Sequence, residues 1–186
     1  MRRSVRTGFV AIAVATMVLA IGVNASHAAS AAEISSSARA ALSRLYASNP
    51  SAKTLGQKAK GILVFPSILK AGFVVGGQGG DGAMFKGGKT VGYYRTAAAS
   101  YGLQAGAQKF GYALFFMTNS ALAYLDKSGG WELGSGPSLV VVDKGLAKSM
   151  STTTLTQDVY AYIFNQQGLM GGLGIQGSKI TRIHPK

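Results

Sequence analysis

The stretch from Ala59 to Gly82 constrains the fold more than any other part of the chain. It contains a short apolar run over Ile62–Phe65, which Pro66 is expected to end, and a second apolar run over Ala71–Val75. A cluster of five glycines follows: Gly76, Gly77, Gly79, Gly80 and Gly82. Short apolar runs bounded by glycine and proline indicate buried strands rather than helices. Because glycine permits tight bends and close backbone approach, the stretch predicts a sharply curved or closing antiparallel sheet.

The same alternation of short apolar runs and glycines continues along the chain, since 24 of the 26 glycines lie between Gly56 and Gly177. The predicted strands are Gly61–Phe65, Ala71–Gly76, Ala83–Lys86, Thr90–Arg95, Ser100–Ala107, Tyr112–Met117, Ser138–Val142, Asp158–Asn165 and Gly172–Ile183. Gly87-Gly88 and Gly129-Gly130 are typical of two-residue hairpin turns. Trp131, the only tryptophan, is expected to pack in the core rather than anchor at a membrane interface.

Helices are expected mainly before the glycine-rich part. Apolar residues recur at helical spacing over Ala32–Ala47, which predicts an amphipathic helix, and Asn49-Pro50 should end it. Packing of this helix on the sheet is favoured over the alternative, a helix that lies on a membrane surface. Ser51–Lys58 suits a short second helix, and Asn119–Asp126 a third. The predicted fold class is α+β and mostly β: an antiparallel, strongly curved or barrel-like sheet with one or two N-terminal helices and a short helix near 119–126.

The first 28 residues have the pattern of a signal peptide. Arg2, Arg3 and Arg6 precede an uncharged, mostly apolar segment over Gly8–Val23, and Ser26-His27-Ala28 fits a cleavage site with small residues. A retained membrane span is the alternative, but the apolar segment is shorter than the roughly 20 residues that a span needs. The expected organisation is a signal peptide over 1–28, an N-terminal amphipathic helix within 29–50 and one domain over 51–186. The expected location is therefore the periplasm or cell envelope, or secretion.

The composition offers little for catalysis or metal binding. There are no cysteines, which excludes disulfides, thiolate catalysis and an N-terminal lipid anchor on cysteine. The only histidine after the signal segment is His184, close to the end of the chain, and the six acidic residues do not cluster. Gly77-x-Gly79-x-x-Gly82 has a dinucleotide spacing but lacks the strand-helix context of such sites. The chain is therefore expected not to be an enzyme and to need no metal or other cofactor.

The charge balance points to an anionic partner. The sequence has 19 basic and six acidic residues, and a basic surface of this size attracts phosphate groups. The candidate binding residues flank the predicted strands: Lys53, Lys58, Lys60, Lys70, Lys86, Lys89 and Arg95, with Lys144 and Lys148 in a later loop. The alternative is a solvated surface with dispersed charges. Nucleic acid is not an expected partner, because an exported protein does not meet the chromosome.

Several long motifs resemble one protein family. They are AKGILVFPSILKAGFVVGGQGGDGAMF, GYYRTAAASYGLQAGAQ, FFMTNSALAYL, GGWELGSGPSLVVVD and YAYIFNQQGLMGGLGIQGSKI. In this order they are similar to the SYLF domain, also called the Ysc84 or Las17-binding actin-regulator domain. The resemblance covers about 51–183.

This resemblance implies a non-catalytic lipid-binding domain. Eukaryotic relatives bind phosphoinositides and act at the actin cytoskeleton and endocytic membranes, through an amphipathic N-terminal helix and basic residues. By position, the helix over Ala32–Ala47 and the lysines at 53, 58, 60 and 70 would have that role here. Because the signal peptide predicts export, actin is not an expected partner, and anionic phospholipid is. A structural or protein-interaction role in the envelope is the alternative function.

Overall fold

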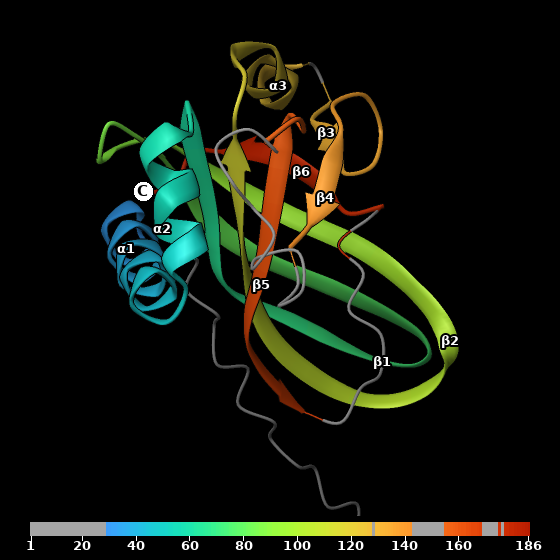
Figure 1. Ribbon diagram of the computed structural model, residues 1–186. Helices are drawn as coiled ribbons and strands as arrows, with labels where there is room; N and C mark the ends of the chain where they lie inside the picture. Colours follow the sequence, from blue (N-terminus) through green and yellow to red (C-terminus); the bar gives the residue numbers. More distant parts are fainter. Residues whose placement is uncertain (1–28, 128, 143–154, 169–174, 176) are drawn as a thin grey trace, which may run out of the picture.

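The structure, a computed structural model, describes residues 29–127, 129–142, 155–168, 175 and 177–186. The predicted signal peptide over 1–28 lies outside the described residues, as do Lys144 and Lys148. The described part is one strongly curled sheet of six strands with two N-terminal helices on its outer face and a short helix at one end (Figure 1). The α+β, mostly β fold class is confirmed. The expectation of a purely antiparallel sheet is wrong at one pair of strands, described below.

Helix α1 spans Ala31–Ser48 and α2 spans Pro50–Lys58, close to their predicted bounds. Ser30 caps α1: its hydroxyl accepts from the Glu33 backbone N–H at 3.2 Å, and Glu33 accepts from the Ser30 backbone N–H at 2.8 Å. The inner side of α1 is buried against the sheet through Ile34, Ala38, Ala41 and Leu45. The helix therefore packs on the domain, as favoured. Across the described residues, none of the helices has the length and apolar character to cross a bilayer.

Two very long strands replace six of the predicted ones. Strand β1 spans Gly61–Lys86 and β2 spans Lys89–Phe116, and they form one antiparallel hairpin along their whole length. The predicted turn at Gly87-Gly88 is confirmed, with φ of 54° and 76°, a conformation that glycine adopts without strain. Pro66 does not end a strand, because a register shift between Phe65 and Ile68 lets β1 continue past it.

The hairpin curls until the two halves of β1 lie side by side. A Cβ placed on Gly82 would lie 2.5 Å from the Val64 carbonyl oxygen, and one on Gly80 would strike the Ser67 carbonyl oxygen. The strand turns back near Gly72, which lies against the backbone of Gly76. The glycine cluster therefore belongs to an extended strand and permits close backbone approach, and the bend precedes it (Figure 1).

The remaining strands extend the sheet from β2. Strand β5 (Val159–Gly168) pairs with the second half of β2, and β6 (Lys179–Ile183) pairs with its first half. The short β3 (Trp131–Glu132) pairs with β6, so the predicted hairpin at Gly129-Gly130 is wrong. The pairing of β4 (Leu139–Val141) with β5 is parallel, which makes the sheet mixed. Helix α3 (Asn119–Ala123) and the 3-10 turn η1 (Tyr124–Asp126) confirm the third predicted helix.

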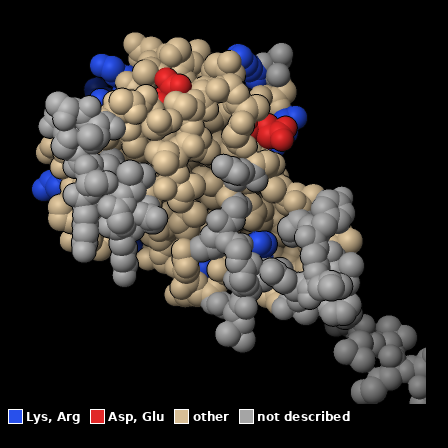
Figure 2. Space-filling view, turned by 45° about the vertical axis from the view of Figure 1, so that its right-hand side comes forward, with Lys and Arg blue, Asp and Glu red and all other residues tan. Residues whose placement is uncertain are grey.

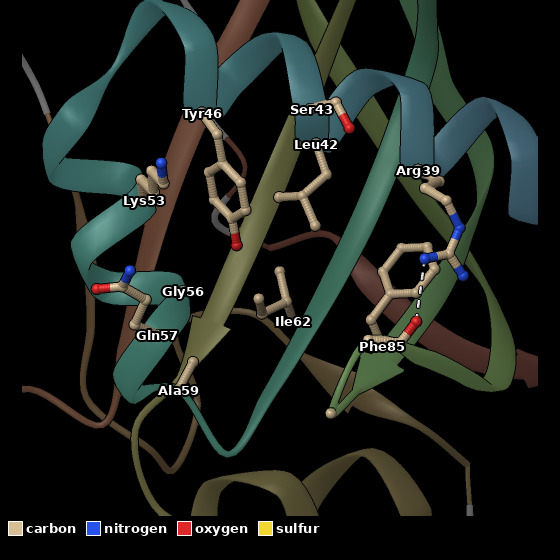
Figure 3. A pocket seen from close by; sticks show the side chains of 12 residues that line it. Arg39, Leu42, Ser43, Tyr46, Lys53, Gly56, Gln57, Ala59, Ile62 and Phe85 are labelled. Carbon is tan, nitrogen blue, oxygen red and sulfur yellow. Dashed lines mark hydrogen bonds between the residues drawn. The ribbon is translucent and has the colours of Figure 1, made fainter.

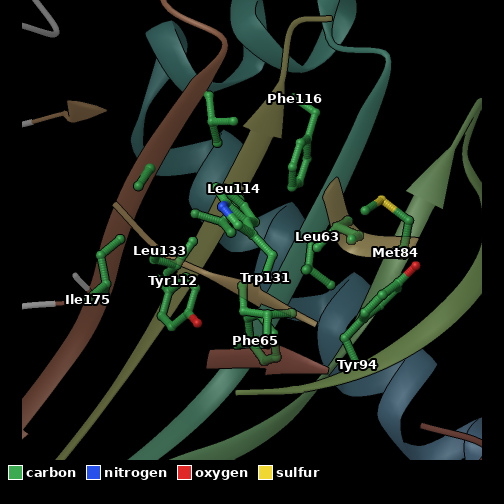
Figure 4. Close-up of a cluster of buried hydrophobic side chains, with 14 of the residues drawn as sticks. Leu63, Phe65, Met84, Tyr94, Tyr112, Leu114, Phe116, Trp131, Leu133 and Ile175 are labelled. Carbon is green, nitrogen blue, oxygen red and sulfur yellow. The ribbon is translucent and has the colours of Figure 1, made fainter. Parts of the chain in front are cut away.

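Apolar side chains fill both faces of the curled sheet. One cluster lies inside the curl, where Leu63, Tyr112 and Phe116 pack around Trp131 (Figure 4). The other lies between the outer face and the two helices. Trp131 is 1% exposed, and its indole N–H donates to the Ser135 carbonyl at 2.8 Å. This burial confirms that Trp131 is a core residue. The hydrogen bond to Ser135 satisfies the indole N–H, which would otherwise be buried without an acceptor.

Asp158 connects α3 to strand β4, and its removal should destabilise the domain. Its carboxylate accepts from the Ser138 backbone N–H and hydroxyl, each at 3.0 Å, and from the Thr118 hydroxyl at 3.1 Å. The Ser138 backbone bond is the main reason that the pKa of Asp158 is lowered. A carboxyl whose pKa is lowered in the folded state stabilises it above the unfolded pKa, and loses that effect as the pH falls through the folded pKa.

We expect Asp158→Ala to lower the midpoint of thermal unfolding by about 2–4 °C at pH 7, corresponding to the loss of about 1 kcal/mol. The difference from wild type should shrink at a pH below the lowered pKa, because the wild-type carboxyl is then protonated as well. Unfolding monitored by circular dichroism at several pH values measures both. Glu132→Ala is the control, since Glu132 is an exposed carboxylate on β3. A midpoint difference that stays constant down to pH 2 would contradict the assignment.

Candidate functional site

A groove lies between α1, α2 and the turn of the β1–β2 hairpin (Figure 3). Its volume is about 460 Å³, within the range of roughly 300–1,000 Å³ that ligand sites have. Its lining residues come from four consecutive parts of the chain: Arg39, Leu42, Ser43, Tyr46, Lys53, Gly56, Gln57, Ala59, Ile62, Phe85, Gly87 and Gly88. The helices and the hairpin therefore build the site together.

The apolar part of the groove follows from two periodicities. Leu42 and Tyr46 are four residues apart, so they lie on the same side of α1. Ile62 and Phe85 are outer-face residues of the two halves of β1, which the curl of the hairpin brings together. Tyr46 lies against Gly56 of α2, where a Cβ would strike its hydroxyl oxygen. A glycine at this point of α2 is therefore required for the contact between the helices.

Two basic side chains lie at opposite ends of the groove (Figure 3). Arg39 donates to the Gly88 carbonyl at 3.0 Å, and its guanidinium carbon lies 5.0 Å from the centre of the Phe85 ring. Lys53, on α2, is exposed and takes part in neither of the ion pairs found among the described residues. Near Lys53 lie the Gln57 amide and the Tyr46 hydroxyl, whose pKa is raised by burial and which therefore stays a donor at neutral pH.

Four more of the predicted binding lysines lie next to this groove. Lys58 and Lys60 flank the lining residue Ala59, and Lys86 and Lys89 flank the lining turn at Gly87-Gly88. Lys60, Lys86 and Lys89 are exposed, and Lys58 is half-buried. The fold thus gathers five of the seven predicted residues, including Lys53, around the same end of the molecule.

The other two predicted residues lie elsewhere. Lys70 is on the curled part of β1, in register with Gln108 of β2. Arg95 on β2 forms a bidentate ion pair with Asp81 on β1, with N–O distances of 2.6 and 2.8 Å. The hydrogen bond from Arg95 to this carboxylate raises the pKa of Arg95. Its charge is therefore largely compensated within the hairpin.

Acidic side chains are kept away from the groove. The described residues that line it include no aspartate or glutamate. Asp81 and Asp126 are paired with Arg95 and Arg182, Glu33 bonds to the cap of α1, and Asp158 bonds to Ser138. On the face in Figure 2, the charged residues lie mainly towards the margins of a broad uncharged surface. The basic residues in and beside the groove therefore have no acidic partner among its lining residues.

Sequence reasoning missed several lining residues. Arg39, Tyr46 and Gln57 are not among the binding residues predicted from the sequence. The spacing of Arg39, Leu42, Ser43 and Tyr46 could have indicated one shared side of a helix. Phe85 could not be associated with them, because its position depends on the curl of β1.

A second hollow, of about 610 Å³, lies on another flank of α1 and is mainly polar. Arg44, Lys109 and Asn165 are among its lining residues. Asn165 has φ of 53°, and it is the only residue other than glycine with a positive φ in the described part of the chain. The hollow is slightly more open to solvent, and apolar residues such as Pro66 and Phe110 form a smaller part of its lining than apolar residues do in the groove.

No metal centre is found among the described residues, where histidine, aspartate and glutamate never form a group of three or more. His184 follows the end of β6. The chain terminus next to it is held in place, since the Lys186 carbonyl accepts from the Ala31 backbone N–H at 3.0 Å.

Comparison with known proteins identifies the second half of the chain. Residues 97–184 match the model of a family described as Ysc84, the Las17-binding protein actin regulator. Over these residues the chain is similar to the Ysc84 (SYLF) family. The matched segment runs from within β2 through β6, so the Ysc84 match confirms the expected family and covers less than the expected 51–183. No curated protein matches the chain. The groove is built entirely from residues that precede the matched Ysc84 segment, so the match does not extend to it.

Proposed function

We propose that this Ysc84-domain chain is a non-catalytic module that binds anionic phospholipid at a membrane surface of the bacterial envelope. The observation that carries the proposal is the group of basic residues around the groove: Arg39, Lys53, Lys58, Lys60, Lys86 and Lys89. No acidic residue shares the groove with them. Each lysine or arginine close to an anionic membrane surface contributes about 1 kcal/mol of attraction, so six could account for substantial binding.

The proposed location depends on the N-terminal segment. The charged start, apolar stretch and small residues before Ala29 support export. The family description names an actin regulator, but an exported protein would meet phospholipid and other envelope polyanions instead of actin. The attachment that we propose is peripheral and electrostatic.

Co-sedimentation with vesicles tests this function. We expect the chain to pellet with phosphatidylglycerol or cardiolipin vesicles at low salt and to remain in solution with phosphatidylcholine vesicles. Binding should fall steeply as salt is raised to about 0.5 M, because the screening length then becomes shorter than the size of a head group. Absence of pelleting with the anionic vesicles at low salt would reject the proposal.

A protein-interaction role is the second candidate, and exposed aliphatic side chains favour it. Leu69 and Val75, on the curled part of β1, are 56% and 59% exposed. Exposed aliphatic residues of this kind commonly contribute to contacts with a partner protein. Capture of an envelope protein by the wild-type chain, lost in a Leu69→Ser and Val75→Ser variant, would support this role if vesicle binding were absent.

A further inference from the structure

The lining of the groove differs along its length, which indicates the orientation of an occupant. Leu42, Ile62 and Phe85 form the middle and the hairpin end (Figure 3). The ammonium group of Lys53, the Gln57 amide and the Tyr46 hydroxyl gather at the α2 end. Such an arrangement suits a molecule with one apolar part and one polar, negatively charged end.

The hairpin end of the groove is closed by groups that already have partners. The Arg39 guanidinium lies over the Phe85 ring at 5.0 Å and donates to the Gly88 carbonyl. At the opposite end, the side chains of Lys53, Gln57 and Tyr46 form no hydrogen bond or ion pair with other described residues. An anion would therefore find free donors beside Lys53 and an apolar surface leading away from it.

The size of the groove limits the occupant to a single small molecule. A volume of about 460 Å³ is typical of sites for one ligand and too small for a patch of bilayer. The open side runs along α1, where Ser43 is exposed at the rim. A hydrocarbon chain lying in the groove would cover the half-buried side chain of Leu42 and the small part of Ile62, 9%, that is exposed.

We propose that the groove binds one single-chain anionic amphiphile, a hydrocarbon chain that ends in a carboxylate or a phosphate. The chain lies over Leu42, Ile62 and Phe85, and the anion is bound by Lys53 with Gln57 and Tyr46. This inference rests on the proposed lipid-binding function and extends it. The surface lysines attract the membrane, whereas the groove takes up a single lipid molecule, such as a fatty acid or a lysophospholipid.

Titration calorimetry with a series of alkyl phosphates and fatty acids, each below its critical micelle concentration, tests the inference. We expect one molecule bound per chain and a tightening of about fourfold for each added methylene. The increase should stop at the chain length that fills the groove. The inference fails if binding does not saturate at one molecule, or if affinity is independent of chain length.

Two pairs of variants locate the site. Ser43→Trp places a large ring at the rim of the groove without changing the core and should abolish amphiphile binding, whereas Ala47→Trp, on an exposed part of α1 outside the groove, should not. Lys53→Glu should weaken binding of the anion at least tenfold, whereas Lys127→Glu should not. Equal effects within either pair would overturn the assignment. Thermal unfolding checks that each variant is folded.

The same variants distinguish this inference from the proposed function. Ser43→Trp should leave vesicle binding nearly unchanged, because it leaves all the lysines at the surface. If vesicles bind but the amphiphiles do not, the groove assignment is wrong and the membrane function stands. If the amphiphiles bind and anionic vesicles do not, the membrane function is wrong and the groove assignment stands.

Discussion

Reversing the charges at Lys86 and Lys89 should weaken binding to anionic vesicles by about 100-fold or more at low salt. Both residues are exposed beside the Gly87-Gly88 turn and belong to neither ion pair of the described chain. Removal of each charge should cost about 1 kcal/mol of attraction, and each new glutamate adds a comparable repulsion. The sum, about 4 kcal/mol, corresponds to a factor of several hundred, and it still exceeds a factor of 100 if screening removes about a quarter of it.

The double variant Lys127→Glu and Lys179→Glu is the matched control. It produces the same change in net charge at positions near β3 and β6, away from the groove. Vesicle titration at low ionic strength, with each variant compared to wild type, measures the difference. If both double variants lose the same amount of affinity, binding depends on net charge alone, and the surface around the groove has no special role.

Gly82→Val should be among the most destabilising single substitutions in the described part of the chain. A Cβ at this position would lie 2.5 Å from the Val64 carbonyl oxygen and 2.7 Å from the Phe65 ring. The crowding atom is backbone that belongs to the same curled strand, so relief requires the two halves of β1 to separate. Overpacking of this kind typically costs 1–3 kcal/mol, and we expect the upper end, with a midpoint lowered by about 10 °C.

Gly77→Val is the control for this prediction. Gly77 belongs to the same glycine cluster and the same strand, but a Cβ there meets only the Ala98 carbonyl oxygen, at 3.6 Å. Its midpoint should change by no more than about 2 °C, since surface substitutions usually lie within 0.5 kcal/mol. Differential scanning calorimetry of both variants makes the comparison. A similar loss in both would show that the glycines matter through strand flexibility and that the close approach is unimportant.

The local sequence pattern predicted the helices and the hairpin turn, because interactions between residues close in sequence decide both. The spacing of Ile34, Ala38, Ala41 and Leu45 determines which side of α1 is buried, whatever lies opposite. Gly87 and Gly88 adopt positive φ at low energetic cost, so this pair of glycines in the sequence was enough to predict the hairpin turn. The limits of the prediction appear at Pro66, where a register shift lets the strand continue, and at β4, whose parallel partner is distant in sequence.

The candidate site was predictable only in part for the same reason. Lysines on α2 and beside the hairpin turn could be identified as candidates, but their sequence separation gave no information on distance. Lys86 and Lys89 lie beside the same groove as Lys53, at its hairpin end, because the curl of β1 brings its second half under α1. Arg95 could not be set apart until Asp81 was seen opposite it on the neighbouring strand.

By itself the sequence determined the class of the fold, the two N-terminal helices, the hairpin turn and the excess of basic charge, since each depends on composition or on neighbours a few residues apart. The stretch over Ala59–Gly82 could be recognised as part of a curved sheet from its apolar runs and clustered glycines alone. Only the tertiary structure decided that Gly80 and Gly82 face Ser67 and Val64 of the same strand. It alone placed Phe85 beside Ile62 to form a groove, because the closing of a curled hairpin is a long-range event that no local pattern specifies.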